Sequence, residues 1–291
     1  MKISVIIPAY NNPKELRLTI DSIIGSDFPL DQVEVLVCDD GSRPSLLPVA
    51  EEYSQRLYVR HFWQEDKGFR PGTARNMGIR AAKGELCLFL DSGVIVTSGC
   101  LSEHYRLYQQ HGTNLVAIGY IYGNDLTSDL CEMREIIDKN TPDRAAEMMA
   151  ERNMLDGRER DYAMCGDQLW RWQAPWIVLW SLHFAVPTEF MRKNEIYFDE
   201  FFNTWGCEDN DFGIRLHSIG GKFVLARDAR AIHYPAKVRS YDRLQNDPDF
   251  RAGWLKNKGY LKEKHKDHSI VQLWLSEGGL AVKKLPLLEE D

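Results

Sequence analysis

The sequence predicts an α/β fold with a mostly parallel central sheet covered by helices on both faces. Three observations predict it. Short apolar runs recur at residues 3–7, 33–38, 57–62 and 86–90, helix patterns separate them, and polar residues stand just beyond their ends. Continuous apolar strands are typical of parallel sheets buried on both faces. The intervening helices supply the crossovers that parallel strands need.

The first helix is expected directly after strand 3–7. Asn12 is predicted as its N-cap, Pro13 as its first residue and Glu15 as the capping-box partner. Its inward face is expected to carry Leu16, Ile20, Ile23 and Ile24. The segment DDGSRP closes strand 33–38 as a turn, and another helix is predicted from about residue 72 to residue 82.

The chain changes character after residue 120 without a Gly/Ser linker or a repeat. Charged helix-like segments occupy 128–140 and 143–155, residues 181–235 return to α/β patterning, and 239–291 have the pattern of charged helices with apolar spacing. We therefore expect one continuous domain with halves at 1–120 and 121–236, followed by a helical extension at 237–291.

Composition excludes some classes of function. The chain has 291 residues, 44% of them hydrophobic and 27% charged, which is ordinary for a globular protein. A formal net charge of -7 argues against a nucleic-acid partner. An anionic ligand would therefore have to be held by local geometry.

The first residues carry one lysine and too short an apolar run for a signal peptide, and no stretch reaches the ~18 apolar residues that span a bilayer. We expect a cytoplasmic protein with no transmembrane segment. The six cysteines form no CxxC pair, so reduced thiols are expected in preference to disulfides or a zinc site.

Polar residues follow three of the predicted strands at the edge where parallel sheets bind ligands. Pro8, Tyr10 and Asn11 follow the first strand, Asp39 and Asp40 end the second, and Asp91 ends the fourth. A nucleoside diphosphate needs acceptors for its base and ribose, cations for its phosphates and usually a divalent metal. Asp40 suits the base, and Asp91 suits the ribose and the metal.

The segment KGFRPGTARNMGI, residues 67–79, adds Arg70 and Arg75 beside a glycine-containing loop that opens a helix. Arginine and a helix N-terminus both favour phosphate. An ordinary helix start would explain either arginine alone, but two cations at the same edge as several acids favour phosphate binding.

A second acidic cluster stands at the start of a predicted helix. Glu208, Asp209 and Asp211 precede the apolar positions Phe212, Leu216 and Ile219. The helix dipole favours acids in a first turn and accounts for one or two of them. Three acids after a Trp-Gly turn also fit a general base beside an acceptor-binding carboxylate.

Together these segments resemble the family 2 glycosyltransferases of the GT-A fold, and most closely the branch of chondroitin polymerases and β-1,4-galactosyltransferases. The resemblance is carried by ISVIIPAYNN, VEVLVCDDGS, GFRPGTARNMGIRAAKGELCLFLDS and FNTWGCEDNDFGIRL followed by AIHYP, in that order. It covers residues 1 to about 110 and 183 to about 236. It implies an inverting transfer of a hexose or N-acetylhexosamine from a nucleotide sugar, with UDP first among the donors. Residues 1–120 would then bind the donor, and 121–236 would bind the acceptor and carry catalysis.

The resemblance also implies roles for individual residues. Asp40 would face the base, Glu208 would bind the acceptor and Asp209 would be the general base. Trp205 and Gly206 would border the acceptor. The other donor-binding positions would be Pro8, Ala9, Tyr10, Asn11, Arg70, Arg75, Asn76, Asp91 and Ser92.

A divalent cation, Mn²⁺ or Mg²⁺, is implied by the same resemblance. Asp91 matches the first acid of the Asp-x-Asp motif, and His233 matches a metal-binding histidine; without the resemblance, His233 would be interpreted as a histidine held by backbone at a strand end. Gly93 stands where relatives have the acid that binds the metal directly. Three explanations follow: a weakly held, more hydrated metal, metal-independent catalysis in which Arg70 or Arg75 stabilises the leaving group, or a degenerate site.

The acceptor is not fixed by these motifs. A glycan, a natural product or a peptide side chain would each fit, and Trp170, Trp172, Trp176 and Trp180 would form either a sugar-binding platform or a packed core or subunit contact, so a homo-oligomer is also considered. A non-catalytic sugar-nucleotide or glycan-binding protein is the alternative function that Gly93 suggests. A nucleotidyltransferase is disfavoured because PAYNNP contains no glycine-rich, lysine-bearing phosphate loop.

Overall fold

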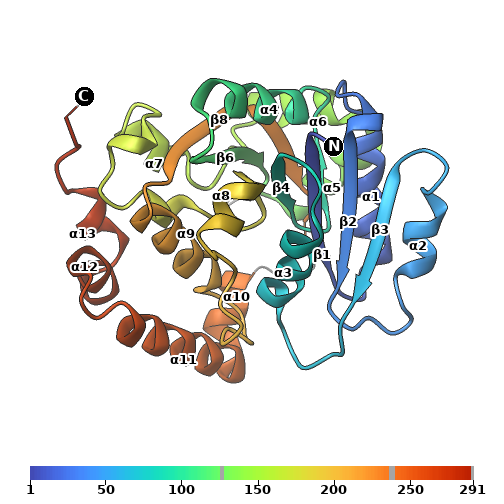
Figure 1. The fold of residues 1–291 in the computed structure, drawn as a ribbon. Helices are drawn as coiled ribbons and strands as arrows, with labels where there is room; N and C mark the ends of the chain where they lie inside the picture. Colours follow the sequence, from blue (N-terminus) through green and yellow to red (C-terminus); the bar gives the residue numbers. More distant parts are fainter. Residues whose placement is uncertain (125–127, 236–239, 290–291) are drawn as a thin grey trace.

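The computed structural model, which describes residues 1–124, 128–235 and 240–289, is built around one eight-stranded sheet with helices on both faces (Figure 1). The strand order is β3-β2-β1-β4-β7-β6-β8-β5. The strands are β1 Ile3–Ala9, β2 Val33–Asp39, β3 Tyr58–Trp63, β4 Leu86–Leu90, β5 Val94–Val96, β6 Leu115–Tyr122, β7 His183–Pro187 and β8 Lys222–His233. Strands β1 to β4 are parallel, as are β6 and β8, whereas β7 is antiparallel to both neighbours and β5 to β8. The predicted mostly parallel α/β fold is confirmed.

Helices cover the two faces of the sheet, and the C-terminal helices lie to one side of it (Figure 1). The first six are α1 Pro13–Ile24, α2 Leu47–Glu52, α3 Pro71–Ala81, α4 Cys100–His111, α5 Leu130–Lys139 and α6 Pro142–Glu151. The others are α7 Glu159–Met164, α8 Thr188–Lys193, α9 Glu208–Ser218, α10 Ser240–Asn246, α11 Pro248–Lys264, α12 Ser269–Glu277 and α13 Gly279–Lys283. Among the described residues, no helix is both long enough and apolar enough to span a membrane.

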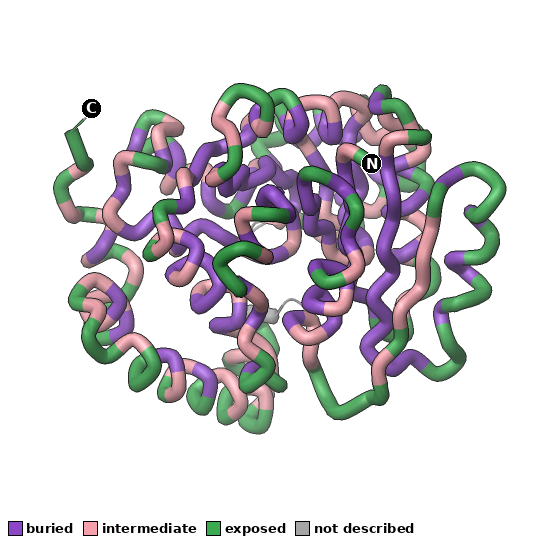
Figure 2. The backbone as a smooth tube through the Cα atoms, viewed as in Figure 1, coloured by how far each residue is buried: buried purple, intermediate pink, exposed green. Residues whose placement is uncertain are grey.

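Two hydrophobic clusters lie on opposite faces of the sheet. Alternate residues of one strand belong to different clusters: Ile6 of β1 packs in one, and Val5 and Ile7 pack in the other. All seven residues of β1 and all seven of β2 are buried, and Figure 2 shows these strands in the colour of buried residues. Most residues of both strands are apolar because both faces are buried, and the buried polar exceptions are Ser4, Glu34 and Asp39.

The start of α1 corrects one prediction. The helix begins at Pro13 after Asn12, as expected, but neither Asn12 nor a capping box forms the predicted side-chain cap. The side-chain oxygen of Asn12 instead accepts a hydrogen bond from the backbone N–H of Tyr10, at 3.1 Å. Asn12 therefore stabilises the turn after β1 and not the helix end.

The tryptophan-rich segment is mainly core. Trp176 is fully buried and packs edge-on against Trp274 of α12, with 5.2 Å between ring centroids, and Trp172 is also buried. Trp170 is exposed. For Trp172 and Trp176 the packed-core alternative is therefore correct, and the ring of Trp176 joins α12 to the body of the protein.

Candidate active site

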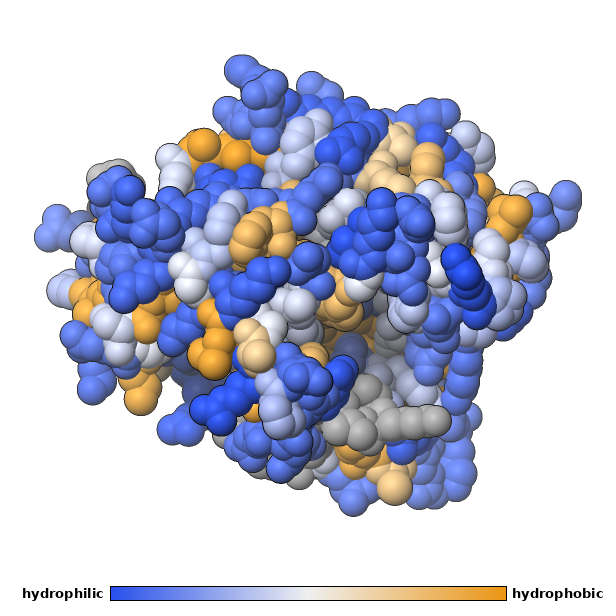
Figure 3. All heavy atoms as spheres, turned by 90° about the horizontal axis from the view of Figure 1, so that it is seen from below, coloured by the Kyte–Doolittle hydropathy of each residue, from blue (hydrophilic) through white to orange (hydrophobic). Residues whose placement is uncertain are grey.

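The carboxyl ends of β1, β2 and β4 lie at one edge of the sheet, as their parallel pairing requires. Figure 3 views this edge from below, and the surface is hollowed near its middle with mainly hydrophilic residues around it. The polar residues predicted at the ends of β1, β2 and β4 therefore lie along this edge.

Asp40 lies just beyond β2 and is almost fully buried. Its Oδ1 accepts a hydrogen bond from Nε2 of Gln64 at 2.5 Å, and its Oδ2 accepts one from the backbone N–H of Arg70 at 2.8 Å. The Arg70 guanidinium lies 3.5 Å from Oδ1. Burial raises the pKa of Asp40, and these hydrogen bonds oppose that rise. Asp40 thus fixes both ends of the 64–70 loop at the predicted base pocket.

The turn after β1 lies beside Asp40. Tyr10 is exposed and donates its hydroxyl hydrogen bond to Oδ2 of Asp66 at 2.9 Å. Asn11 has a φ of 51° and fastens this turn to the turn after β2: its N–H donates to Oγ of Ser42, and its Oδ1 accepts from the N–H of Arg43, both at 2.9 Å. Pro8 and Ala9 are buried at the end of β1 and form the base of the turn.

Arg75 is the central cation of this edge. It is buried, and its Nη2 donates to Oδ1 of Asp91 at 2.5 Å. Its Nε and Nη1 are buried and have no hydrogen-bond partner among the described residues. Buried guanidinium donors are normally satisfied, so Arg75 has the N–H groups of these two nitrogens left for an anionic ligand.

Asp91 follows β4 and His233 ends β8, near enough for the charge of Asp91 to act on the imidazole. The N–H of Asp91 donates to the carbonyl of Leu182 at 3.0 Å, its side chain is 35% exposed, and His233 pairs with Val94 at the end of β8. Burial lowers the pKa of His233, and the nearby charge of Asp91 opposes that shift. A neutral imidazole beside a partly exposed carboxylate has the chemistry of a metal-ligand pair. The adjacent Ser92 has a buried hydroxyl without a described partner.

Gly93 adopts a left-handed conformation, with a φ of 101°. A Cβ at this position would lie 3.5 Å from Cβ of Glu15 and 3.8 Å from Cβ of Tyr234, so there is room for a side chain. Its backbone is fixed by two hydrogen bonds, from its N–H to Oγ1 of Thr19 and from the N–H of Tyr234 to its carbonyl. The absence of an acid here is therefore coupled to a backbone conformation that favours glycine.

Glu208 and Asp209 are the first two residues of α9, and the charge of Arg75 acts on both. Burial raises the pKa of Glu208, the charge of Asp209 raises it further, and Arg75 partly offsets both effects. Burial also raises the pKa of Asp209, opposed by the N–H of Asn210, the charge of Arg75 and the backbone of Ser181. The shift is larger for Glu208 than for Asp209. At neutral pH this arrangement favours a protonated Glu208 beside an ionised Asp209.

The turn that delivers these acids is strained. Gly206 and Cys207 have φ values of 94° and 75°, and a left-handed conformation is costly for a residue with a side chain. Trp205 is partly exposed and stacks on Phe250 of α11, with 5.2 Å between centroids. The Trp-Gly element is therefore held in place by tertiary contacts.

Asn76 is the predicted donor-site residue whose side chain is already committed elsewhere. It is fully buried, its Nδ2 donates to the carbonyl of Phe198 and to Glu200, and its Oδ1 accepts the N–H of Phe198. The structure thus brings Arg75 and Asp91 together with the acids of α9, while Asn76 anchors the 198–200 segment to α3.

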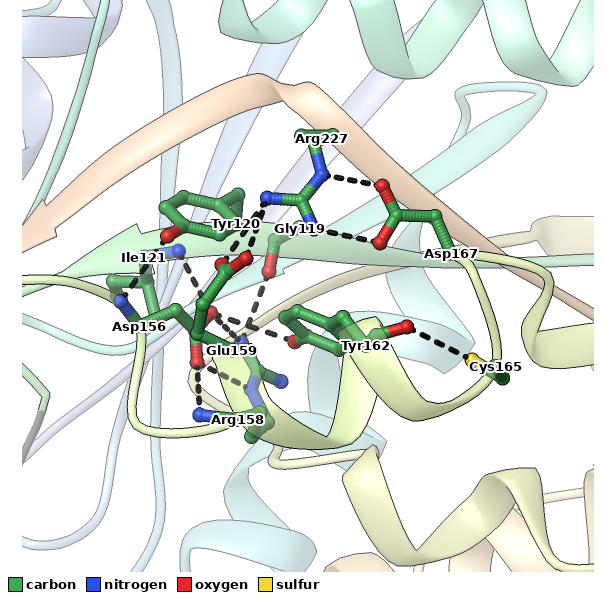
Figure 4. A network of polar contacts seen from close by, with 10 residues as sticks. All are labelled: Gly119, Tyr120, Ile121, Asp156, Arg158, Glu159, Tyr162, Cys165, Asp167 and Arg227. Atoms are coloured by element: carbon green, nitrogen blue, oxygen red, sulfur yellow. Dashed lines mark hydrogen bonds and ion pairs between the residues drawn. The ribbon is translucent and has the colours of Figure 1, made fainter.

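Asp156 and Arg158 form a buried ion pair within the polar network of Figure 4. Arg158 and Asp156 lie 2.7 Å apart with both side chains fully buried. Arg158 also donates to the carbonyls of Gly119 in β6 and Val178, and Asp156 accepts the N–H of Ile121. Residues 179–182 follow Val178 and lead into β7. Because Ser181 contacts Asp209 and Leu182 contacts Asp91, this segment supports both acids.

Sequence reasoning missed several of these residues. Gln64 comes just after β3, so the rule that found Asp40 and Asp91 could also have found it. Ser181 acts through its backbone, and Asp156 and Arg158 lie in a charged stretch whose pattern resembles an exposed helix. No local signal marks these three.

One group of metal-ligating residues among the described positions is separate from Asp91 and His233. Cys100, His104 and His183 are buried between α4 and the sheet. The Nε2 atoms of the two histidines lie 2.9 Å apart, a hydrogen-bond distance, and burial lowers the pKa of both. We interpret them as a neutral histidine pair within the core.

A mostly parallel sheet with acids and a buried arginine beyond its carboxyl edge has the architecture of an α/β enzyme. Residues 4–204 match the family model described as "Glycosyl transferase family 2". The chain therefore belongs to this family and is a glycosyltransferase.

Known proteins agree with this assignment. The chain is 31% identical to a validoxylamine A glucosyltransferase of Streptomyces hygroscopicus subsp. jinggangensis over 80% of its length and 55% of that protein. It is 28% identical to a chondroitin synthase of Escherichia coli over 83% of its length and 36% of that protein. It thus spans about half or less of these relatives.

Solved structures of glycosyltransferases share the fold. S. aureus TarS 1–349 in complex with UDP-GlcNAc aligns with a TM-score of 0.60 and 21% identity over 96% of this chain and 71% of that one. The mannosyltransferase PcManGT of Pyrobaculum calidifontis, in complex with GDP-Man and Mn²⁺, aligns with a TM-score of 0.59 and 16% identity over 94% and 69%. The predicted resemblance to GT-A family 2 enzymes is confirmed.

Proposed function

We propose that the protein is an inverting glycosyltransferase that moves a sugar from a UDP-sugar to a hydroxyl, or a similar nucleophile, of a glycan, natural-product or peptide acceptor. The observation that carries the proposal is the position of Arg75. Its guanidinium donates a hydrogen bond to Asp91 beyond the carboxyl end of β4, and its charge lowers the pKa of both Glu208 and Asp209 against the larger effect of burial. The UDP-GlcNAc complex of the structural neighbour TarS supports UDP as the nucleotide.

The two acids of α9 have different tasks in this reaction. Asp209 is the general base: it takes the proton of the acceptor as the acceptor oxygen forms a bond to the anomeric carbon. The bond from that carbon to the diphosphate breaks on the opposite face, and its electron pair leaves with UDP. Glu208, kept protonated by burial and by Asp209, donates a hydrogen bond to the acceptor.

Cations stabilise the leaving diphosphate. The unpaired Nε and Nη1 of Arg75 supply buried donors, and Arg70 lies at the same edge. A divalent cation, when bound, would neutralise further charge on the diphosphate. Asp91 and His233 are the protein groups that fit it, and Gly93 offers no ligand, so most of its coordination would come from phosphate oxygens and water.

The direct test is a screen of nucleotide sugars for release of the nucleoside diphosphate, with and without Mn²⁺, using the wild type and Asp209→Asn. We expect turnover of at least one UDP-sugar by the wild type, and loss of turnover with retained UDP binding in the variant. Binding of UDP without turnover of any donor, alone or with glycan and natural-product acceptors, would favour the non-catalytic alternative suggested by Gly93.

A further inference from the structure

The C-terminal helix α11 lies against the turn that carries the catalytic acids, although it is outside the residues 4–204 that match the family model (Figure 1). One face of α11 makes these contacts. Phe250, Gly253, Trp254 and Asn257 follow helical spacing and all contact the segment 204–206. The extension therefore packs directly on the site and not on a remote surface.

Asn257 makes the most specific of these contacts. Its side chain is fully buried, and its Nδ2 donates to the carbonyls of Gly206 at 2.8 Å, Thr204 at 3.0 Å and Trp205 at 3.4 Å. Its Oδ1 is buried without a partner among the described residues. The NH₂ group of the Asn257 amide can donate to these three carbonyls, whereas its oxygen could not pair with them.

The packing around Asn257 leaves the turn little freedom. A Cβ on Gly206 would lie 2.9 Å from Cδ1 of Trp254, and a Cβ on Gly253 would lie 2.9 Å from Cβ of Thr204. The next residue, Cys207, is held with a φ of 75°. A strained turn persists only where its surroundings determine it, and here α11 provides those surroundings.

The C-terminal end of α11, with His265 just after it, also contacts the first turn of α9. Asp211 is fully buried and accepts a hydrogen bond from His265 at 2.9 Å, with Lys264 at 2.8 Å. Glu208 and Asp209 are thus placed between two contacts made by α11, one through the carbonyls of 204–206 and one through Asp211.

We propose that Asn257 is a positioning residue for Glu208 and Asp209, so that the C-terminal extension is a working part of the active site. This rests on the proposed function. Asn257 touches neither donor nor acceptor; it acts by holding the carbonyls of the 204–206 turn, which fixes the direction in which α9 presents its acids. A displacement of about 1 Å is enough to cost on the order of 100-fold in rate.

The test is Asn257→Asp, which keeps the shape but replaces two donors by a carboxylate facing three carbonyls. Asn194→Asp, the same chemical change at an exposed position, is the control. We expect kcat to fall about 100-fold in Asn257→Asp with UDP affinity within twofold of wild type, a smaller change in the acceptor KM, and a displaced pH–rate profile. Asn257→Ser, which keeps one donor, should give an intermediate kcat.

An unchanged kcat and pH profile in Asn257→Asp would overturn the proposal. Parallel loss of UDP binding and thermal stability in Asn257→Asp and Asn257→Ser would also overturn it, because that result means a purely structural role. Titration of the Glu208 and Asp209 carboxyl groups by ¹³C NMR separates this proposal from the proposed function. Displaced titration in the uncharged Asn257→Ser variant supports the positioning role even if no donor is turned over by the wild type.

Discussion

Nη2 of Arg75 lies 2.5 Å from Oδ1 of Asp91, and this contact joins the helix after the 64–70 loop to the end of β4. The same guanidinium lowers the pKa of both Glu208 and Asp209 against the larger effect of burial. One buried cation therefore connects Asp91, at the end of β4, to the acids of α9, and the predictions below follow from that arrangement.

Replacing Arg75 by lysine should lower kcat/KM about 100-fold, because lysine keeps the charge but cannot donate to Asp91 and to a diphosphate at once. Steady-state kinetics with the best donor measures the effect. Arg80→Lys, on the exposed side of the same helix, is the control and should be close to wild type. Equal rates for Arg75→Lys and Arg80→Lys would show that Arg75 does not contact the reacting groups.

The pH–rate profile should be bell-shaped. Asp209 must be ionised to accept a proton, and its pKa is raised to about 6, so the rate should rise as the pH increases through that value. Glu208 must be protonated to donate, and its pKa is raised to about 8, so the rate should fall above it. Glu208→Gln, which is always neutral, should lose the alkaline limb and keep the acid limb. An alkaline limb that persists unchanged in this variant contradicts the assigned role of Glu208.

Breaking the buried pair behind the site should be costly. Arg158→Met leaves Asp156 as an unpaired buried charge, and we expect the free energy of unfolding to fall by about 3–5 kcal/mol. Arg144→Met, which removes an exposed pair with Glu147, should change it by less than about 1 kcal/mol. Urea unfolding followed by circular dichroism measures both, and similar small changes for the two variants would mean that the pair adds no stability.

An acid at position 93 should strengthen metal binding while it weakens the fold. Gly93→Asp restores a carboxylate to the Asp-x-Asp motif, but a side chain at a φ of 101° is strained, so the melting temperature should fall. Gly93→Ala carries the same backbone cost without the carboxylate. In calorimetric titrations with UDP present, Gly93→Asp should bind Mn²⁺ more tightly than Gly93→Ala; equal affinities would mean that position 93 does not face the ion.

Much of the carboxyl edge of the sheet was predictable because its signals are local. The apolar runs of β1, β2 and β4 end in polar residues, and the parallel order brings those ends together, so Asp40 and Asp91 could be placed from sequence. The acids of α9 follow a recognisable Trp-Gly turn. These elements need only strand periodicity and chain order.

The supporting residues were not predictable, because their roles depend on contacts distant in the sequence. Asn257 meets Gly206 across 51 positions and has the appearance of an ordinary polar residue in a charged helix. Asn12 shows the opposite error: its position predicts a helix cap, but the N–H of Tyr10 competes for its side chain. A local sequence pattern does not indicate which of several backbone N–H groups a side chain will bind.

The most direct test of the central claim is isothermal titration of UDP into the wild type and into Arg75→Lys, each with and without Mn²⁺. The account predicts saturable binding to the wild type, and about tenfold weaker binding, or about 1.4 kcal/mol, for the variant. No binding of UDP or of any other nucleoside diphosphate to the wild type under either condition would contradict it.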